Sequence, residues 1–265
     1  FPPELDPMTG EITQMLPDVF NPDILKPAVE KATSVVQKPD TKVEAGTNIP
    51  FKVGESLNYK ASFSGIDAAT GRLEVLGMET INNISTYHVR FSANTHGVAN
   101  FLFPIRDIID LWLDQNSLEP IRVKKNISEG KYKKKSVSNL SQSQEFAIVR
   151  NDTISMGTGT HSPYSLFYFF RNKNLSKIDG EIFTTIEGKK ITPLKMKVTE
   201  GINIGVPVGN FNCTEVTPMR IDKKKFKNEA TMSIWFSNDE HRYPVQIWLK
   251  MKFGAFVLKL DEITN

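Results

Sequence analysis

The sequence predicts a mainly β protein, a large antiparallel meander that forms a curved sheet or a partly open barrel. From Phe51 onward, apolar and polar residues alternate with a period of two in several runs. Turn signals separate these runs, and no strand–helix–strand alternation occurs, which disfavours a parallel sheet. This spacing predicts about ten to twelve strands.

Alternation is clearest in four runs, residues 57–63, 87–93, 245–251 and 256–260. Successive side chains of a strand point to opposite faces, so one face of each run meets a core and the other meets water. Glycine, asparagine and aspartate mark the expected turns, at residues 67–71, 82–83, 187–188, 209–210, 238–239 and 253–254.

The first fifty residues differ from the rest, because they hold eight of the 15 prolines. Proline lacks a backbone donor and fixes φ, so this segment cannot supply a central strand. We therefore expect a Pro-rich N-terminal arm over residues 1–50, with at most one short helix near residues 27–37. Residues 51–265 are expected to form a single antiparallel β domain. The arm is either a spacer in a cell envelope or a leader packed on the domain.

One aromatic segment interrupts the alternation. Ser162 and Pro163 suit the start of a helix, and residues 164–171 carry aromatic side chains nearly all round it. Such a helix has to be buried on most sides, so we expect it on the concave side of the sheet, as a lid or as a core plug. Its candidate ligand-binding residues are Tyr164, Phe167, Tyr168 and Arg171.

A second departure from apolar character lies in residues 103–114. We interpret this segment as a strand, with Asp107 on the face of Ile109 and with Arg106 and Asp110 on the opposite face. One interpretation is a carboxylate site for a hard cation; the other is an Arg106–Asp ion pair on a solvated face. No ligand loop is visible, so we predict no metal. Arg106, Asp107 and Asp110 complete the candidate ligand-binding residues.

No motif indicates catalysis or a cofactor. The four histidines lack metal-ligand spacing, and no Gly-x-Ser-x-Gly elbow occurs. Cys213, the single cysteine, lies in an alternating strand and is expected to be a small core residue. The glycine-rich residues 157–160 lack the lysine of a phosphate loop. An enzyme is therefore the least favoured class, although buried convergent carboxylates or a buried His161 would reopen it.

Charge also limits the partners. The chain has 33 basic and 30 acidic residues and no reading module, so we expect no nucleic acid. No apolar run approaches the ~20 residues of a membrane helix, so membrane contact is peripheral at most. Lysines cluster at residues 124–135 and 223–227. They either contact anionic lipid or an acidic partner, or protect exposed strand edges.

Several dispersed motifs resemble the domain-of-unknown-function family 3108 of exported bacterial envelope proteins. They lie between about residues 51 and 263, at residues 53–59, Gly65, Gly71, 106–107, 165–171, 235–239, 242–245 and 253–254. The resemblance implies a periplasmic or outer-envelope location and supplies no activity. The first residue is phenylalanine rather than methionine, which suggests that an upstream segment was removed, either a signal peptide by its peptidase or residues left out by design.

These observations leave three functional hypotheses. The first is a non-catalytic envelope protein that binds or carries an apolar, lipid-like ligand in the concave face of the sheet. The alternative is a structural or assembly factor that contacts an envelope protein or peptidoglycan, and an enzyme is third. We also expect Arg171 to pair with Asp107 or Asp110 beside the aromatic helix.

Overall fold

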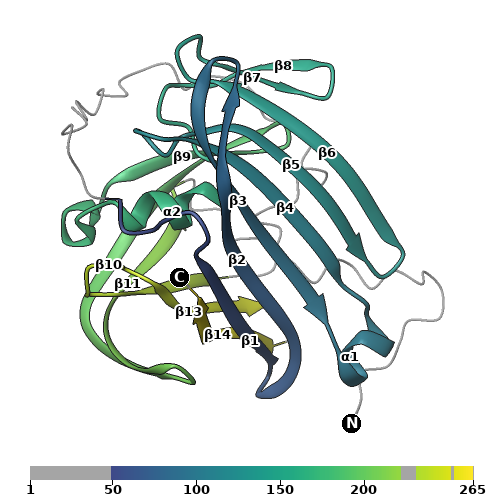
Figure 1. The fold of residues 1–265 in the computed structure, drawn as a ribbon, viewed down its shortest axis with the longest axis vertical. Coiled ribbons are helices and arrows are strands. Elements are labelled where there is room, and N and C mark those ends of the chain that lie inside the picture. The colour runs from purple at the N-terminus through teal and green to yellow at the C-terminus, as the bar shows by residue number, and fades with distance from the viewer. Residues whose placement is uncertain (1–48, 222–230, 252–253, 265) are drawn as a thin grey trace.

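The computed structural model describes residues 49–221, 231–251 and 254–264. These residues form one antiparallel curved sheet (Figure 1), which confirms the predicted fold class. The described residues form fourteen strands, more than the ten to twelve expected; two of them, at residues 146–149 and 152–155, have four residues each and are too short to show clear alternation. The strands are β1 (Ser56–Phe63), β2 (Ile66–Ile81), β3 (Ile84–Thr95), β4 (Arg106–Asp114), β5 (Pro120–Glu129), β6 (Tyr132–Ser141), β7 (Phe146–Val149), β8 (Asp152–Ser155), β9 (Ile182–Glu187), β10 (Lys190–Val206), β11 (Gly209–Arg220), β12 (Thr231–Ser237), β13 (Pro244–Met251) and β14 (Gly254–Thr264).

The strand order shows two meanders joined at β1. Strands β1 to β8 follow one another across one half of the sheet, and β14 to β9 follow one another across the other half. β1 pairs with β2 on one side and with β14 on the other. The edges of the sheet are therefore β8 and β9, which come from the middle of the chain.

Alternation along β1 shows how the sequence makes the concave face. Leu57, Tyr59 and Ala61 are buried, whereas Asn58 and Lys60 between them point outward. Leu57 lies opposite Leu73 of β2 and Ile263 of β14, so the apolar side chains of adjacent strands line up on one face. This face carries the core, as period-two alternation in an antiparallel sheet requires.

Helix α2 (Ser165–Arg171) lies on the concave side of the sheet, and all seven of its residues are buried. It begins three residues after Ser162, whose hydroxyl oxygen accepts the backbone N–H groups of Ser165 (3.1 Å) and Tyr164 (3.2 Å). Ser162 therefore acts as an N-cap residue, although it lies three positions before the first residue of α2. Phe91 of β3 makes edge-to-face contacts with Tyr164, Phe167 and Tyr168.

The segment before α2 extends the sheet at the β9 edge. The backbone N–H of His161 donates to the carbonyl of Thr184 (2.9 Å), and the N–H of Ile186 donates to the carbonyl of His161 (2.8 Å). These two bonds make a parallel bridge to β9. Lys189, beyond β9, forms an ion pair with Asp152 of β8 (2.7 Å). The two edges of the sheet are therefore linked through this region.

Two further helical turns were not expected from the sequence. The first is α1 (Gly97–Leu102), between β3 and β4, in which no residue is buried. The second is the 3-10 turn η2 (Leu175–Ile178), which follows α2 and buries Leu175 and Ile178. Both are too short to show a helical period in the sequence.

Some predictions concern residues outside the described part of the chain. They are the Pro-rich arm over residues 1–50, of which only residues 49 and 50 are described, the short helix near residues 27–37 and the lysines between residues 223 and 227. The strand over residues 106–114 and the buried position of Cys213 fall within the described part and are observed there.

Candidate functional site

The side chain of Arg171, at the end of α2, forms a buried bidentate ion pair with Glu55. Its Nη1 lies 2.6 Å from Oε1 of Glu55, and its Nη2 lies 2.8 Å from Oε2. Glu55 directly precedes β1, so the pair joins the helix to the strand that links the two meanders. Both side chains are buried. Two parallel charge-assisted bonds of this kind fix geometry as well as contributing energy.

The remaining surroundings of Arg171 satisfy its other donors. Its guanidinium group donates to the carbonyl oxygens of Pro50 and His241. The rings of Phe51, Tyr168 and Tyr243 lie 5.3 to 5.8 Å from its central carbon. Burial alone would lower the pKa of Arg171, but the hydrogen bonds and charge of Glu55 outweigh burial and raise it. Arg171 therefore remains charged as the anchor of α2.

The predicted pairing of Arg171 with Asp107 or Asp110 is wrong. Asp110 lies on the outer face of β4, where it pairs with other residues. Asp107 lies on the concave face, but its partners are Ser128 and Glu129. Glu55 takes the place beside Arg171, and its distance of 116 residues along the chain hid the pair from sequence reasoning.

Asp107 and Glu129 form a second buried cluster, at the end of the concave face where β4 starts and β5 ends. Both side chains are 4% exposed, and the backbone N–H of Ser128 donates to Asp107 (2.8 Å). The two carboxyl groups lie close together, so ionisation of one opposes ionisation of the other. Burial, followed by the charge and hydrogen bond of Asp107, raises the pKa of Glu129 to about 8. Burial also raises the pKa of Asp107.

Tyr164 and an ion pair lie close to these carboxyl groups. Lys125 of β5 pairs with Glu187 of β9, and its ammonium group lies 4.8 Å from the centroid of the Tyr164 ring. Burial raises the pKa of Tyr164, and the charges of Glu187, Asp107 and Glu129 add to the effect. This contact joins β5 and β9, which lie far apart in the strand order, across the concave side.

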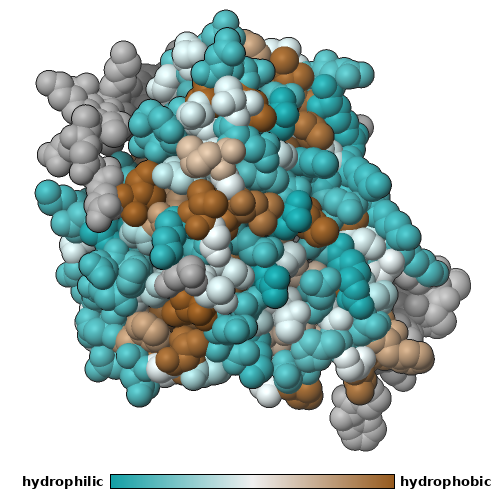
Figure 2. All heavy atoms as spheres, in the orientation of Figure 1, coloured by the Kyte–Doolittle hydropathy of each residue, from teal (hydrophilic) through white to brown (hydrophobic). Residues whose placement is uncertain are grey.

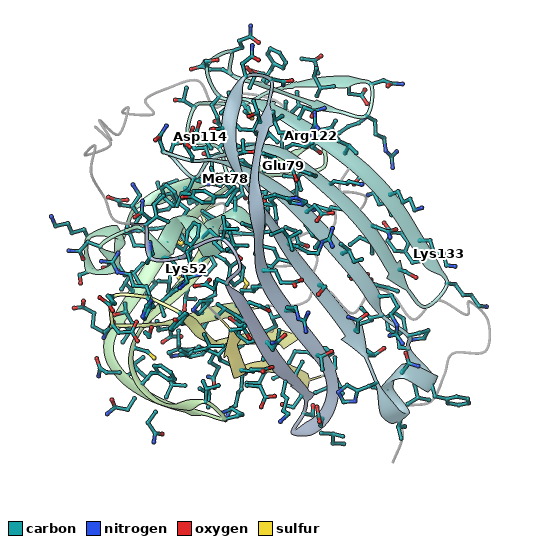
Figure 3. The ribbon with its side chains drawn as sticks, viewed as in Figure 1. Lys52, Met78, Glu79, Asp114, Arg122 and Lys133 are labelled. Atoms are coloured by element: carbon teal, nitrogen blue, oxygen red, sulfur yellow. The ribbon has the colours of Figure 1, made fainter. Side chains whose placement is uncertain are left out.

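A third polar network covers the outer face of β2 to β4. Asp110 accepts from Arg90 (2.7 Å) and contacts His88 (3.0 Å), whose other ring nitrogen lies 2.7 Å from Glu79. Glu79 also accepts the indole N–H of Trp112 (2.7 Å). Burial opposes ionisation of Asp110, but the bonds from Arg90 and His88 hold its pKa below the ordinary value. Figure 3 labels Glu79 on this face, near Arg122, whose guanidinium lies over the Trp112 ring.

The seven candidate ligand-binding residues therefore occupy different places. Tyr164 lies near the Asp107 carboxyl, and Phe167 and Tyr168 pack in the core against Phe91. Arg171 is anchored elsewhere, and Asp110 belongs to the outer network. Arg106 is exposed and donates to the carbonyl of Thr95 (3.0 Å), so the expected Arg106–Asp ion pair is not formed. A ligand-binding role for these residues remains a prediction.

His161 is buried, and its side chain contacts the start of α2. Its Nδ1 lies 3.2 Å from the hydroxyl of Ser165, which donates to the carbonyl of Ser162 (3.0 Å). Burial, with a smaller contribution from the charge of Lys173, lowers the pKa of His161 to about 3, so the imidazole is neutral. Within the described residues, no group of three or more His, Cys, Asp or Glu side chains is placed to hold a metal ion.

Sequence reasoning missed Glu55, Lys125, Glu129 and Glu187. A signal existed for Glu129, because alternation along β5 places it on the face of Val123 and Ile127, toward the core. The glycine that follows it suggested a hairpin tip instead. Glu55 lies in the motif at residues 53–59 and Arg171 in the motif at residues 165–171, but no local pattern pairs them.

Comparison with known proteins agrees with this description. A family model described as "Protein of unknown function (DUF3108)" matches residues 58–261. The crystal structure of a beta-barrel-like protein of the domain of unknown function DUF1849 from Brucella abortus superimposes with a TM-score of 0.54 and 13% identity, covering 80% of this chain and 97% of that one. The crystal structure of a protein described as a "putative lipoprotein" from Parabacteroides distasonis superimposes with a TM-score of 0.40 and 12% identity, covering 80% of this chain and 96% of that one. No curated protein matches the sequence.

The fold and its interior define a β-barrel-like protein whose curved sheet encloses its own helix. Because the family model covers most of the described sheet, the chain belongs to the DUF3108 family of proteins of unknown function. None of the helices in the described part of the chain has the length and apolar character needed to cross a membrane.

Proposed function

We propose that this protein is a non-catalytic factor of the bacterial envelope that acts through its outer surface, as a structural or assembly component. The observation that carries the proposal is the position of α2, whose seven buried residues pack on the concave side of the sheet. The aromatic side chains of α2 pack against Phe91 of β3 and occupy space that an apolar ligand on this face would need. This observation favours a surface function over the carrier hypothesis.

The cost of moving α2 supports a plug rather than a lid. Moving α2 would separate the Arg171–Glu55 pair and return both charges to water, where hydration offsets much of the lost attraction. Exposing Phe167, Tyr168, Phe169 and Phe170 costs about 1.5–3 kcal/mol for each ring, or roughly 6–12 kcal/mol together. The sum is comparable with the 5–15 kcal/mol that typically separates a folded domain from its unfolded state. Opening the concave face would therefore come close to unfolding the protein.

Catalysis has little geometric support. The Asp107–Glu129 pair brings together two carboxyl groups of the kind that acid–base chemistry uses, but both are buried and the backbone N–H of Ser128 occupies one oxygen of Asp107. The neutral His161 contacts the hydroxyl of Ser165, which already donates to the carbonyl of Ser162. We therefore keep an enzyme as the least favoured class. The envelope location is part of the proposal, supported by family membership.

Lipid analysis of the purified full-length protein tests the proposal against the carrier hypothesis. Organic extraction followed by mass spectrometry should yield no lipid at one molecule per chain, because the interior is occupied. Crosslinking of intact cells with an amine-reactive reagent should capture a defined partner through exposed lysines such as Lys133. Release of the protein by osmotic shock would support the location. Stoichiometric lipid together with absence of any crosslinked partner would contradict the proposal and favour a carrier.

A further inference from the structure

The tip of the molecule at α1 carries the most exposed apolar side chains of the described structure. Phe101 is 87% exposed, Val98 75%, Ile66 73% and Leu102 68%. The next large hydrophobic residue, Ile182, is 56% exposed and lies on β9. Single exposed apolar residues are normal on protein surfaces, but a cluster that contains the four largest exposures marks a contact surface.

These four side chains belong to one place in the fold. Ile66 begins β2, and three of the six residues of α1 are the others. The backbone N–H of His96, directly before α1, donates to the carbonyl of Ala68 (3.1 Å), which holds the helix beside the first turn of the sheet. Figure 1 shows α1 and the β1–β2 turn at the same lower end, and Figure 2 shows hydrophobic side chains along that edge.

A basic turn is fixed next to this apolar tip. The backbone N–H of Gly130, between β5 and β6, donates to the carbonyl of Pro104 (2.8 Å). Phe103 is buried directly beneath Gly130, where a β-carbon would lie 3.1 Å from its ring. The exposed side chains near this contact include four basic ones, Arg106, Lys131, Lys133 and Lys135, together with Tyr132. Figure 3 labels Lys133 at the outer side of this turn.

Acidic side chains are scarce around the tip. Residues 96–106 contain no Asp or Glu, and residues 124–137 contain only Glu129, which is buried. The exposed Asp67 lies opposite His96, with 3.5 Å between its carboxylate and the imidazole. The tip therefore has an apolar centre with a cationic side, the pattern of a surface that meets anionic head groups and the apolar layer beneath them.

We propose that the α1 tip docks on the surface of a bilayer that contains anionic phospholipid. Phe101, Leu102 and Val98 enter the boundary between head groups and acyl chains, while the lysines of the β5–β6 turn contact lipid phosphates. α1 is about 9 Å long, which suits shallow insertion and excludes spanning. This docking rests on the proposed surface function and names the surface that the protein uses.

The charge around the tip favours an anionic bilayer over a groove on a protein partner. A groove on a partner would also bury Phe101 and Leu102, but it would need acidic side chains placed opposite each lysine. An anionic bilayer presents negative charge everywhere along its plane, so it matches a loose group of lysines without specific placement. A second copy of this chain offers the same basic side and would repel it.

Vesicle flotation with the full-length protein tests the docking. The protein should float with vesicles of mixed phosphatidylcholine and phosphatidylglycerol, and neither with phosphatidylcholine alone nor with the mixture in high salt. The double variant Phe101→Ser/Leu102→Ser should weaken binding by at least tenfold, since two apolar side chains no longer leave water. Lys131→Glu/Lys133→Glu should weaken it by at least roughly fivefold per lysine.

Matched variants elsewhere on the surface serve as controls. Ile182→Ser removes an exposed apolar side chain, and Lys195→Glu/Lys197→Glu makes the same change of charge on β10. Both should bind vesicles as the wild type does. The docking is overturned by absence of binding to anionic vesicles, by equal binding to neutral ones, or by controls that lose as much as the tip variants. A protein that fails to float but still yields no extracted lipid leaves the proposed surface function standing.

Discussion

The buried Arg171–Glu55 pair gives the sharpest prediction for stability. Glu55→Gln keeps the size of the side chain and removes its charge, so Arg171 stays charged and buried without a counterion. Removing one partner of a buried pair usually costs about 3–5 kcal/mol. Arg171 retains the carbonyl oxygens of Pro50 and His241 and three aromatic faces, so we expect the lower end, about 3 kcal/mol.

Urea-induced unfolding, followed by far-ultraviolet circular dichroism, measures this loss. At a slope near 3 kcal/mol per molar urea, a loss of about 3 kcal/mol moves the midpoint down by about 1 M with an unchanged slope. The matched control is Asp261→Asn, which breaks the exposed Lys60–Asp261 pair (2.8 Å) and should move the urea midpoint little.

A double variant separates the lost charge from lost packing. Glu55→Gln/Arg171→Met replaces the unpaired cation with a flexible apolar side chain, so it should be more stable than Glu55→Gln alone. The reasoning is refuted if Glu55→Gln lies within about 1 kcal/mol of the wild type, or if it costs no more than Asp261→Asn.

Three further predictions concern stability: two describe its dependence on pH, and one describes a substitution in the β5–β6 turn. The folded-state pKa of Glu129, about 8, exceeds its ordinary value of 4.5, so the free energy of unfolding should fall as pH rises between these values, by up to about 1.4 kcal/mol per pH unit. Urea titrations at several pH values should show that Glu129→Gln loses this pH dependence. The same pH dependence in the wild type and the variant would count against the Asp107–Glu129 pair. The folded-state pKa of His161, about 3, lies below 6.5, so stability should fall as pH drops through this window, and His161→Gln should be less acid-sensitive in thermal melts. Gly130→Ala should lower the free energy of unfolding by about 1–2 kcal/mol, because the φ of Gly130 is +55° and the ring of Phe103 lies beneath it. The control Gly77→Ala, which has open space around its β-carbon, should change the urea midpoint little.

The fold was predictable because alternation is a local signal. The strand over residues 106–114 and the opposite faces of Asp107 and Asp110 follow from period two alone, and the structure agrees. The burial of α2 followed from aromatic side chains on every side of a short helix. Each of these features depends on neighbours within about ten residues.

The polar contacts depend on register between distant segments, which no local pattern reports. Arg171 meets Glu55 because α2 crosses the concave face and ends above the start of β1. Lys125 meets Glu187 because the sheet curves enough to bring β5 toward β9. α1 escaped prediction for a different reason, since six residues without a buried face give no period to detect.

The position of β14 affects how the chain can assemble. β1 lies beside β14 in the middle of the sheet, and their paired residues are about two hundred positions apart. Each meander can form from near neighbours, but the seam between them closes a very long loop, which is the slow kind of contact in folding. A nascent chain that lacks β14 would hold two half-sheets with unpaired inner strands, β1 and β13, exposed as templates for other chains. Production of this protein should therefore depend on protection of these two strands until synthesis of the last one is complete.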